Sequence, residues 1–359
     1  MHFVRTGDRA ALRLGLASAQ HYLDVDLTHY SSEQPDWVGT QHTHSHGLFG
    51  HHTAQGPDFG HAGYTQGLLW HSYLTGDPEG LAGARGVADW CLRKLGVHTN
   101  GMERVLGHPL MTLNDVYEAT GDERYLRGSA HLVDQAFKWE HPLRGGFLSA
   151  ITESPAYYSG SSFNNGLVSA GLLKFNGWAR LPEIDAVLER FARWTLTDVW
   201  IWPLGIATKG GSVHKGGNAQ FISTHARMMA QVYERTKDPL YLAVPARLAS
   251  AGFDARAKPI PGTRSVGMVY NYLPWLTAAV GKHGRPEPEP QFEVVPPGGP
   301  LTLTAGGRAI VTFNVRNTGA QPIENLVVFF HTRLDFTTAT MQPLPARLLP
   351  GQLASCQFE

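Results

Sequence analysis

The sequence has little of what marks the specialised classes of protein. Its 359 residues contain only two cysteines, Cys91 and Cys356, and their wide separation argues against a disulfide framework. Thirty basic residues balance 30 acidic ones, which argues against a general nucleic-acid binder. No run of about 18 apolar residues occurs, so no membrane-spanning helix is predicted. With 42% hydrophobic and 17% charged residues, the chain has the composition of an ordinary globular protein.

The sequence also lacks a recognisable signal peptide, because its first ten residues contain no apolar core. Both ends look like cut ends. The chain opens within a helical-hairpin pattern and stops at "LASCQFE" in a strand pattern. We therefore expect a fragment of a longer product, for which a secreted or periplasmic location stays open.

A loose internal repeat runs through the first 280 residues. A Thr-Gly-Asp-like turn followed by apolar residues at spacings of three and four begins near positions 5, 74, 119 and 235, with a degenerate copy at 180. The Asp or Thr side chain can accept hydrogen bonds from the first amides of a helix. An apolar-periodic segment also precedes each turn. The predicted unit is therefore helix, tight turn, helix.

These units predict a mainly α fold, an (α/α) toroid of about five to six helical hairpins, not necessarily complete, over residues 1–282. An open helical solenoid fits the same repeat, but the repeats are few and irregular. Residues 283–297 are rich in Pro and Gly, which predicts a linker. Residues 298–359 alternate apolar and polar residues between turn signals, which predicts a small, truncated β-sandwich-like module. The toroid is the candidate catalytic domain.

Four long connections separate the helical units, and in a toroid they gather at one mouth. They span residues 24–60, 97–108, 139–162 and 200–220. They are rich in His, Trp, Tyr and Gly, whereas the helices are rich in Ala, Leu, Arg and Val. Because long loops in a compact domain are usually functional, we expect the functional residues in these four segments.

The first connection contains "HTHSHGLFGHH", residues 42–52, which holds five of the 18 histidines. In an extended segment His42, His44 and His46 would point to one side, where they can converge on a divalent metal such as Ca or Zn. No recognised zinc spacing is present, however, and no cofactor is predicted to be required. Proton transfer is the second interpretation, because an unperturbed imidazole titrates at about pH 6.5. Hydrogen bonding within a polar loop is the third.

Residues 24–90 resemble the first half of the toroid domain of exo-rhamnogalacturonan lyase-like proteins. The shared elements are Asp36-Trp37, the His-rich loop at 42–52, the segment His61–Pro78 entering a helix, and the closing Ala88–Trp90. The resemblance is weaker over residues 140–280 and only compositional beyond them. It implies that the toroid is catalytic, that it adjoins β-sandwich modules, and that the substrate is a pectin- or rhamnogalacturonan-like glycan.

A polysaccharide lyase removes the C5 proton of a uronic acid and expels the 4-linked sugar. It needs a group that neutralises the carboxylate, a base and an acid. The candidate catalytic residues are His46, His52 and His214 as bases, and Tyr64, Tyr157 and Tyr158 as acids. The candidate substrate-binding residues are Asp36, Trp37, His44, His61, Arg144, Trp202, Lys209 and Lys215, with Arg104 as a second candidate for the carboxylate.

Two other functions fit the same segments. A glycoside hydrolase on the same toroid would use two carboxylates, roughly 5–5.5 or 6.5–9.5 Å apart. Its candidates are Glu33, Asp36, Asp58, Glu140 and Glu153, with Asp24 and Asp26 nearby. A non-catalytic glycan-binding or scaffold protein would have its histidines dispersed. The abundance of His and Tyr favours β-elimination, so the expected partner is a polysaccharide or oligosaccharide, with no nucleic acid and no membrane; the oligomeric state stays open.

Overall fold

The computed structural model describes residues 2–41, 57, 59–96, 103–141, 145–147, 162–201, 206–207, 224–253, 278, 281–283, 291–295, 298, 310–324, 345 and 347–358. The chain divides into two compact units. The first consists of Met1–Ile151 with Phe163–Arg193, and the second of Thr152–Ser162 with Trp194–Glu359.

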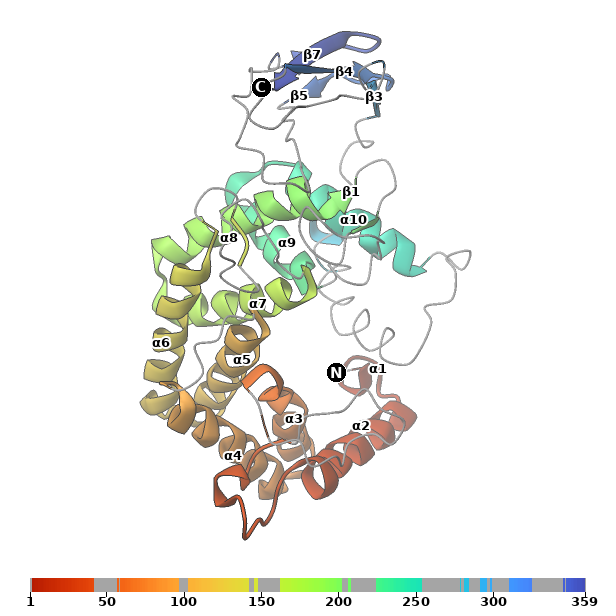
Figure 1. The fold of residues 1–359 in the computed structure, drawn as a ribbon. Helices are drawn as coiled ribbons and strands as arrows, with labels where there is room; N and C mark the ends of the chain where they lie inside the picture. The colour runs from red at the N-terminus through yellow and green to blue at the C-terminus, as the bar shows by residue number, and fades with distance from the viewer. Residues whose placement is uncertain are drawn as a thin grey trace. The chain divides into compact units, whose positions relative to one another are not determined.

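Ten α-helices lie within the described residues, and they follow one another as five pairs (Figure 1). The pairs are α1 His2–Thr6 with α2 Arg9–His21, α3 Thr65–Thr75 with α4 Pro78–Lys94, α5 Glu103–Thr120 with α6 Glu123–Trp139, α7 Ser162–Ala179 with α8 Pro182–Trp194, and α9 Ala226–Thr236 with α10 Leu240–Phe253. Only two or three residues separate the two helices of each pair. The predicted unit of helix, tight turn and helix is therefore confirmed.

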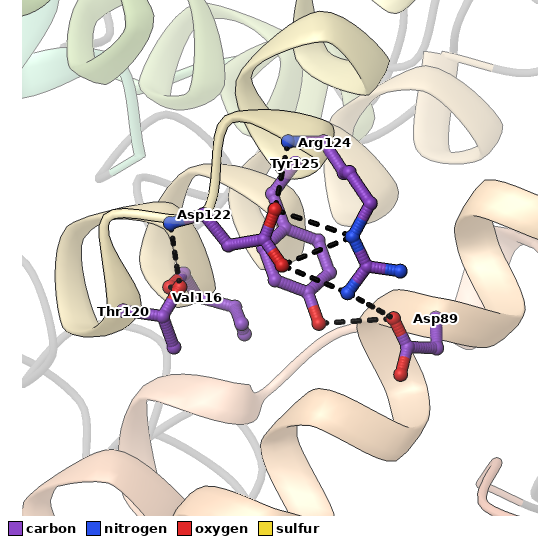
Figure 2. A network of polar contacts seen from close by, with 6 residues as sticks. All are labelled: Asp89, Val116, Thr120, Asp122, Arg124 and Tyr125. Carbon is purple, nitrogen blue, oxygen red and sulfur yellow. Dashed lines mark hydrogen bonds and ion pairs between the residues drawn. The ribbon is translucent and has the colours of Figure 1, made fainter.

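The turns between paired helices share one hydrogen-bonding scheme, which Figure 2 shows for Thr120-Gly121-Asp122. Thr120 Oγ1 donates to the Val116 carbonyl at 2.7 Å and accepts from the Asp122 amide at 3.2 Å. The Asp122 carboxylate then accepts from the Arg124 amide at 3.0 Å, which caps α6. Gly121 adopts the left-handed conformation with φ +68°, which lets the chain reverse within two residues.

The same bonds recur in the turns at 75–77 and 236–238. The middle residue is again left-handed, with φ +77° in the first and +60° at Lys237 in the second. The degenerate copy reaches the same shape differently. There Arg180 has φ +50°, and the Asn176 side chain accepts from the Leu181 amide at 2.7 Å.

The turn in Figure 2 also ties two hairpins together. Tyr125 Oη donates to Asp89 of α4 at 2.9 Å, and burial together with that carboxylate raises the pKa of Tyr125 to about 12. Arg124 Nη2 lies 2.8 Å from Asp122 Oδ2 and 4.0 Å from Asp89 Oδ1. Because this guanidinium is exposed, its ion pairs contribute little to stability, and the buried phenol is the firmer link.

The helices differ in how they are buried. Helices α6 and α8 each bury one face, whereas α5 and α7 are buried on nearly every side. This difference is expected between the outer and the inner helices of a toroid. The two inner helices approach closely through glycine. A Cβ on Gly107 would lie 2.6 Å from the Leu167 side chain, and one on Gly171 would lie 2.8 Å from Leu110. Asn114 Nδ2 also donates to the Gly171 carbonyl at 2.9 Å.

Helix α5 begins earlier than the sequence suggested. Residues 103–108 were expected in the connection 97–108, but they form the first turns of α5. Pro109, which is typical of a first helical turn, lies inside this helix instead. As a result, Glu103, Arg104 and His108 are on a helix and not in a loop.

The C-terminal strands form two small antiparallel sheets. The first has the order β3-β4-β7 and the second pairs β5 with β6. The strands are β3 Phe292–Val295, β4 Val311–Asn317, β5 Ile323–Glu324, β6 Arg347–Leu348 and β7 Leu353–Phe358. Buried Val315, Ile323, Leu348 and Ala354 join the two sheets in one core, as in a β-sandwich. Strand β3 lies within residues 283–297, the stretch expected to be a linker. A further hairpin pairs β1 Trp200–Ile201 with β2 Ile206–Ala207.

His225 is a fully buried imidazole just before α9. Its Nε2 lies 2.5 Å from the Ser162 carbonyl and its Nδ1 lies 2.9 Å from Thr195 Oγ1. A carbonyl only accepts, so Nε2 carries the hydrogen and Nδ1 accepts from the threonine. The ring also stacks on Trp194, with the ring centroids 6.3 Å apart. Burial lowers the pKa of His225 to about 4.

We expect this imidazole to make stability depend on pH. Its folded-state pKa lies below the ~6.5 of an unfolded chain, so its contribution is fully present above that value and is lost as the pH falls towards 4. The free energy of unfolding in urea should fall by up to about 3 kcal/mol over this window. His225→Gln should flatten the dependence, whereas His131→Gln, at an exposed helical position, should keep it. Equal pH slopes in His225→Gln and the unchanged chain would contradict the assignment.

The left-handed turn residues give a second prediction. A Cβ on Gly121 meets no atom within 4 Å, so the cost of Gly121→Ala is purely conformational. We expect it to lower the free energy of unfolding by about 1–2 kcal/mol. Gly177→Ala is the matched control, because its Cβ is equally unobstructed but its backbone is helical. That change should stabilise the protein by up to about 1 kcal/mol in the same denaturant titration, and a loss of similar size for both would refute the argument.

Candidate active site at the start of helices α3 and α5

Many of the expected site residues lie outside the described residues, and their roles stay predictions. These are His42, His44, His46, His52, Arg144, Tyr157, Tyr158, Trp202, Lys209, His214 and Lys215, together with Asp58 and Glu153. Asp36, Trp37, His61 and Tyr64 are described. The structure brings His61 and Tyr64 together with the start of α5, where they form a cluster with Arg104 and His108.

The segment that leads into α3 is tightly folded. A 3-10 turn at Phe59–His61 is followed by a narrower turn, in which the Gly63 amide donates to the His61 carbonyl at 2.7 Å. Tyr64 then adopts the left-handed conformation, with φ +66° and ψ 15°, directly before the helix. Such a conformation costs an aromatic residue about 1–2 kcal/mol, and it is typical of positions where function demands it. The Tyr64 side chain is 58% exposed.

One face of α5 lies against this segment. Arg104, His108 and Thr112 follow at intervals of four, so their side chains share that face. Arg104 Nη1 lies 3.0 Å from His61 Nε2. Because a guanidinium only donates, this nitrogen of His61 accepts and carries no hydrogen. The Thr112 hydroxyl donates at 2.8 Å to the carbonyl that follows His61.

His108 is buried and requires a glycine opposite it. Its ring meets the Tyr64 ring edge-on, with the ring centroids 5.0 Å apart. A Cβ on Gly63 would lie only 2.9 Å from His108 Cγ, closer than such atoms approach in proteins. Gly63 therefore admits the imidazole against the turn, and the imidazole in turn supports the phenol of Tyr64.

A buried carboxylate holds the first residue of α5. Glu103 Oε1 accepts from Asn165 Nδ2 of α7 at 2.9 Å, and Asn165 Oδ1 accepts from the Phe147 amide at 2.5 Å. A negative charge is favourable at a helix N-terminus, where backbone amides have no helical partners. This network joins the starts of α5 and α7 to Phe147.

The Arg104 side chain is suited to binding an anion. It makes no ion pair with any described residue, and its buried Nε has no hydrogen-bond partner among them. A guanidinium at the N-terminus of a long helix favours a carboxylate or another oxyanion.

The remaining described candidates are placed differently. Asp36 contacts Lys94 of α4 at 2.7 Å, and that ammonium group lowers the pKa of Asp36. Trp37 is partly exposed beside it. Glu140, a carboxylate considered for hydrolysis, is bound through both oxygens by Arg190, at 2.7 and 2.8 Å. The structure therefore does not join these residues to the His61 cluster.

Within the described part of the chain, no three His, Cys, Asp or Glu side chains are grouped to hold a metal ion. The expected metal ligands His42, His44 and His46 lie outside that part. None of the described helices is both long and apolar enough to cross a membrane.

The sequence missed His108, Gly63 and Asn165. For His108 a signal existed, because Arg104, His108 and Thr112 have helical spacing, but the late expected start of α5 concealed it. Gly63 and Asn165 act on residues 45 and 62 positions away, and nothing local in the sequence indicates such partners.

No protein-family model and no curated protein matches the chain. Solved structures do resemble it. The alpha-1,6-mannanase GH76A of Salegentibacter sp. HEL1_6 is 14% identical, covering 76% of this chain and 81% of its own, with a TM-score of 0.57. A polysaccharide lyase is 12% identical, covering 79% and 87%, with a TM-score of 0.58. An unsaturated glucuronyl hydrolase specific for heparin is 14% identical, covering 76% and 68%, with a TM-score of 0.51.

At such low identity the likeness shows the fold alone. The chain is thus a mainly α protein with an (α/α) toroid followed by a small β-sandwich, as predicted. The more specific resemblance to exo-rhamnogalacturonan lyase-like proteins stays a prediction. A second structure of this mannanase is of an inactive variant, in which two consecutive aspartates are replaced, in complex with alpha-1,6-mannotetrose.

The close contact at Gly63 gives a prediction about the cluster. Gly63→Ala must displace the His108 ring, so we expect it to lower the free energy of unfolding by about 1–3 kcal/mol. Gly67→Ala, on the first turn of α3, meets no atom within 4 Å and should be neutral or stabilising. Denaturant unfolding of both variants measures the difference, and equal stabilities would show that the glycine is not required.

Proposed function

We propose that this chain is a carbohydrate-active enzyme, a polysaccharide lyase that cleaves a uronate-containing, pectin- or rhamnogalacturonan-like glycan by β-elimination. The observation that carries the proposal is the cluster at the starts of α3 and α5. There the Arg104 guanidinium, which makes no ion pair with any described residue, lies close to an unprotonated imidazole nitrogen and an exposed phenol.

Each part of an elimination has a group suited to it. Arg104, with His61 beside it, binds the uronate carboxylate and stabilises the negative charge that develops when C5 is deprotonated. A base takes the C5 proton, and the electron pair forms the C4–C5 double bond as the C4–O bond breaks. The Tyr64 phenol protonates the departing oxygen. The candidates for the base are His46, His52 and His214.

The similar structures support glycan chemistry without choosing the reaction. By their names, one is a lyase and two are hydrolases. Two features of this chain bear on the hydrolase alternative. No two aspartates are adjacent anywhere in its 359 residues, unlike the pair replaced in the inactive mannanase variant. The carboxylate of Glu140 is occupied by Arg190.

The test is product analysis on rhamnogalacturonan and pectic polymers. A lyase produces a 4,5-unsaturated sugar that absorbs in the ultraviolet, whereas a hydrolase releases reducing ends without that absorbance. Reducing ends alone would establish the hydrolase alternative. Neither product, together with measurable glycan binding, would establish a non-catalytic binding protein.

Substitutions in the cluster test the roles of its individual residues. Arg104→Gln and Tyr64→Phe should each lower kcat/KM for elimination by about 100-fold or more, because each removes a group that acts on the transition state. Tyr73→Phe is the matched control, since Tyr73 lies on α3, the helix that Tyr64 precedes, and is also 58% exposed. An equal loss in Tyr73→Phe, or full activity in Tyr64→Phe, would remove Tyr64 from the mechanism.

The expected divalent metal at His42, His44 and His46 also remains a proposal. Metal analysis of the purified protein, before and after chelation, tests it. A stoichiometric ion lost together with activity supports the site, and the absence of a stoichiometric ion in active protein excludes it.

A further inference from the structure

The hydroxyl of Tyr22 reaches two places that are far apart in the sequence. Tyr22 begins a π-helical turn, Tyr22–Asp26, that continues α2. Its Oη lies 2.8 Å from Gln41 Oε1 and 3.0 Å from the Gly63 carbonyl oxygen. These residues stand on either side of the His-rich stretch, Gln41 before it and Gly63 shortly after it. One phenol therefore contacts two described segments of the chain, at Gln41 and at Gly63.

The backbone around Gln41 is anchored independently. Leu27 pairs with Gln41 in an antiparallel bridge, and the Thr28 amide donates to the Thr40 carbonyl at 2.8 Å. Gly39 packs against Gly86 of α4, where a Cβ on Gly86 would lie 3.0 Å from the Gly39 carbonyl oxygen. Gln41 thus belongs to an anchored part of the backbone, and the Tyr22 hydroxyl that contacts it can hold Gly63 in place.

Two consecutive carbonyls ahead of Tyr64 are taken by hydroxyl groups from different elements. The Ala62 carbonyl accepts from Thr112 of α5, and the Gly63 carbonyl accepts from Tyr22. These bonds fix both peptide planes that precede the left-handed Tyr64. An unfavourable backbone conformation persists only when its surroundings specify it, and these two hydroxyls provide that specification.

We propose that Tyr22 is a positioning residue, whose hydroxyl ties the Gly63–Tyr64 backbone to Gln41 so that the Tyr64 phenol stays against His108. This inference rests on the proposed function, in which Tyr64 is the acid. Burial raises the pKa of Tyr22 well above its usual range, so the hydroxyl retains its hydrogen under ordinary assay conditions.

The experiment compares Tyr22→Phe with Tyr125→Phe. Both changes remove one hydroxyl from an enclosed tyrosine, but Tyr125 donates to Asp89, away from the cluster. Hydrogen–deuterium exchange of the peptide covering residues 59–66 measures how firmly this backbone segment is held. It should speed up at least about tenfold in Tyr22→Phe and stay unchanged in Tyr125→Phe, because only the first loses a bond to that segment.

Kinetics then separates positioning from simple stability. In Tyr22→Phe, kcat for elimination should fall about tenfold while KM stays within about twofold, since a misplaced acid weakens the transition state more than binding. The thermal midpoints of the two variants should fall by similar amounts, and kcat of Tyr125→Phe should match the unchanged chain.

The outcomes separate the two proposals. Unchanged exchange at 59–66 in Tyr22→Phe overturns the positioning role, whatever the activity. Faster exchange with kcat equal to that of Tyr125→Phe also overturns it, because Tyr22 then serves the fold alone. Faster exchange in a protein that never yields unsaturated product supports the hold on Gly63–Tyr64 and refutes the lyase.

Discussion

The close approach of α5 to the turn before α3 is the contact on which the candidate site depends. Gly63 has no side chain, and His108 therefore fits against the backbone and supports the Tyr64 ring. On the same face of α5, Arg104 reaches His61 and Thr112 reaches the intervening carbonyl. Steric fit at Gly63 and hydrogen bonds from α5 therefore act together to specify the positions of His61 and Tyr64.

The hairpin turns explain why this contact forms at the starts of helices. Each tight turn places a left-handed residue after the first helix of a pair, which leaves the long connection at the opposite end. Helices α3, α5, α7 and α9 all begin after such a connection. Their first amides lack helical partners, so anionic groups are favoured at these starts. Glu103 occupies one of these positions, and the proposed uronate carboxylate would lie near the same helix end.

The sequence predicted the parts that are determined locally. Thr-Gly-Asp carries its capping bonds within a few residues, so the paired helices could be identified, and even the degenerate copy at Arg180 keeps the left-handed turn. The residue types of His61 and Tyr64 predict substrate binding and proton transfer, and the structure places both against the start of α5. The residues that pack against this cluster could not be predicted from the local sequence. Pro109 concealed the true start of α5, and Asn165 meets Glu103 only because α5 and α7 pack together.

That packing has a consequence for the spacing of the helices that carry the candidate site. Gly107 lies between Arg104 and His108 along α5 and touches Leu167, just after Asn165 on α7. With no side chain at 107, the two helices are as near as their main chains permit. Any larger residue would meet the α7 backbone at Leu167 and Val168 and push the two helices apart near their first turns. The distance between the helix starts that carry Arg104 and Asn165 therefore depends on the absence of a methyl group at residue 107.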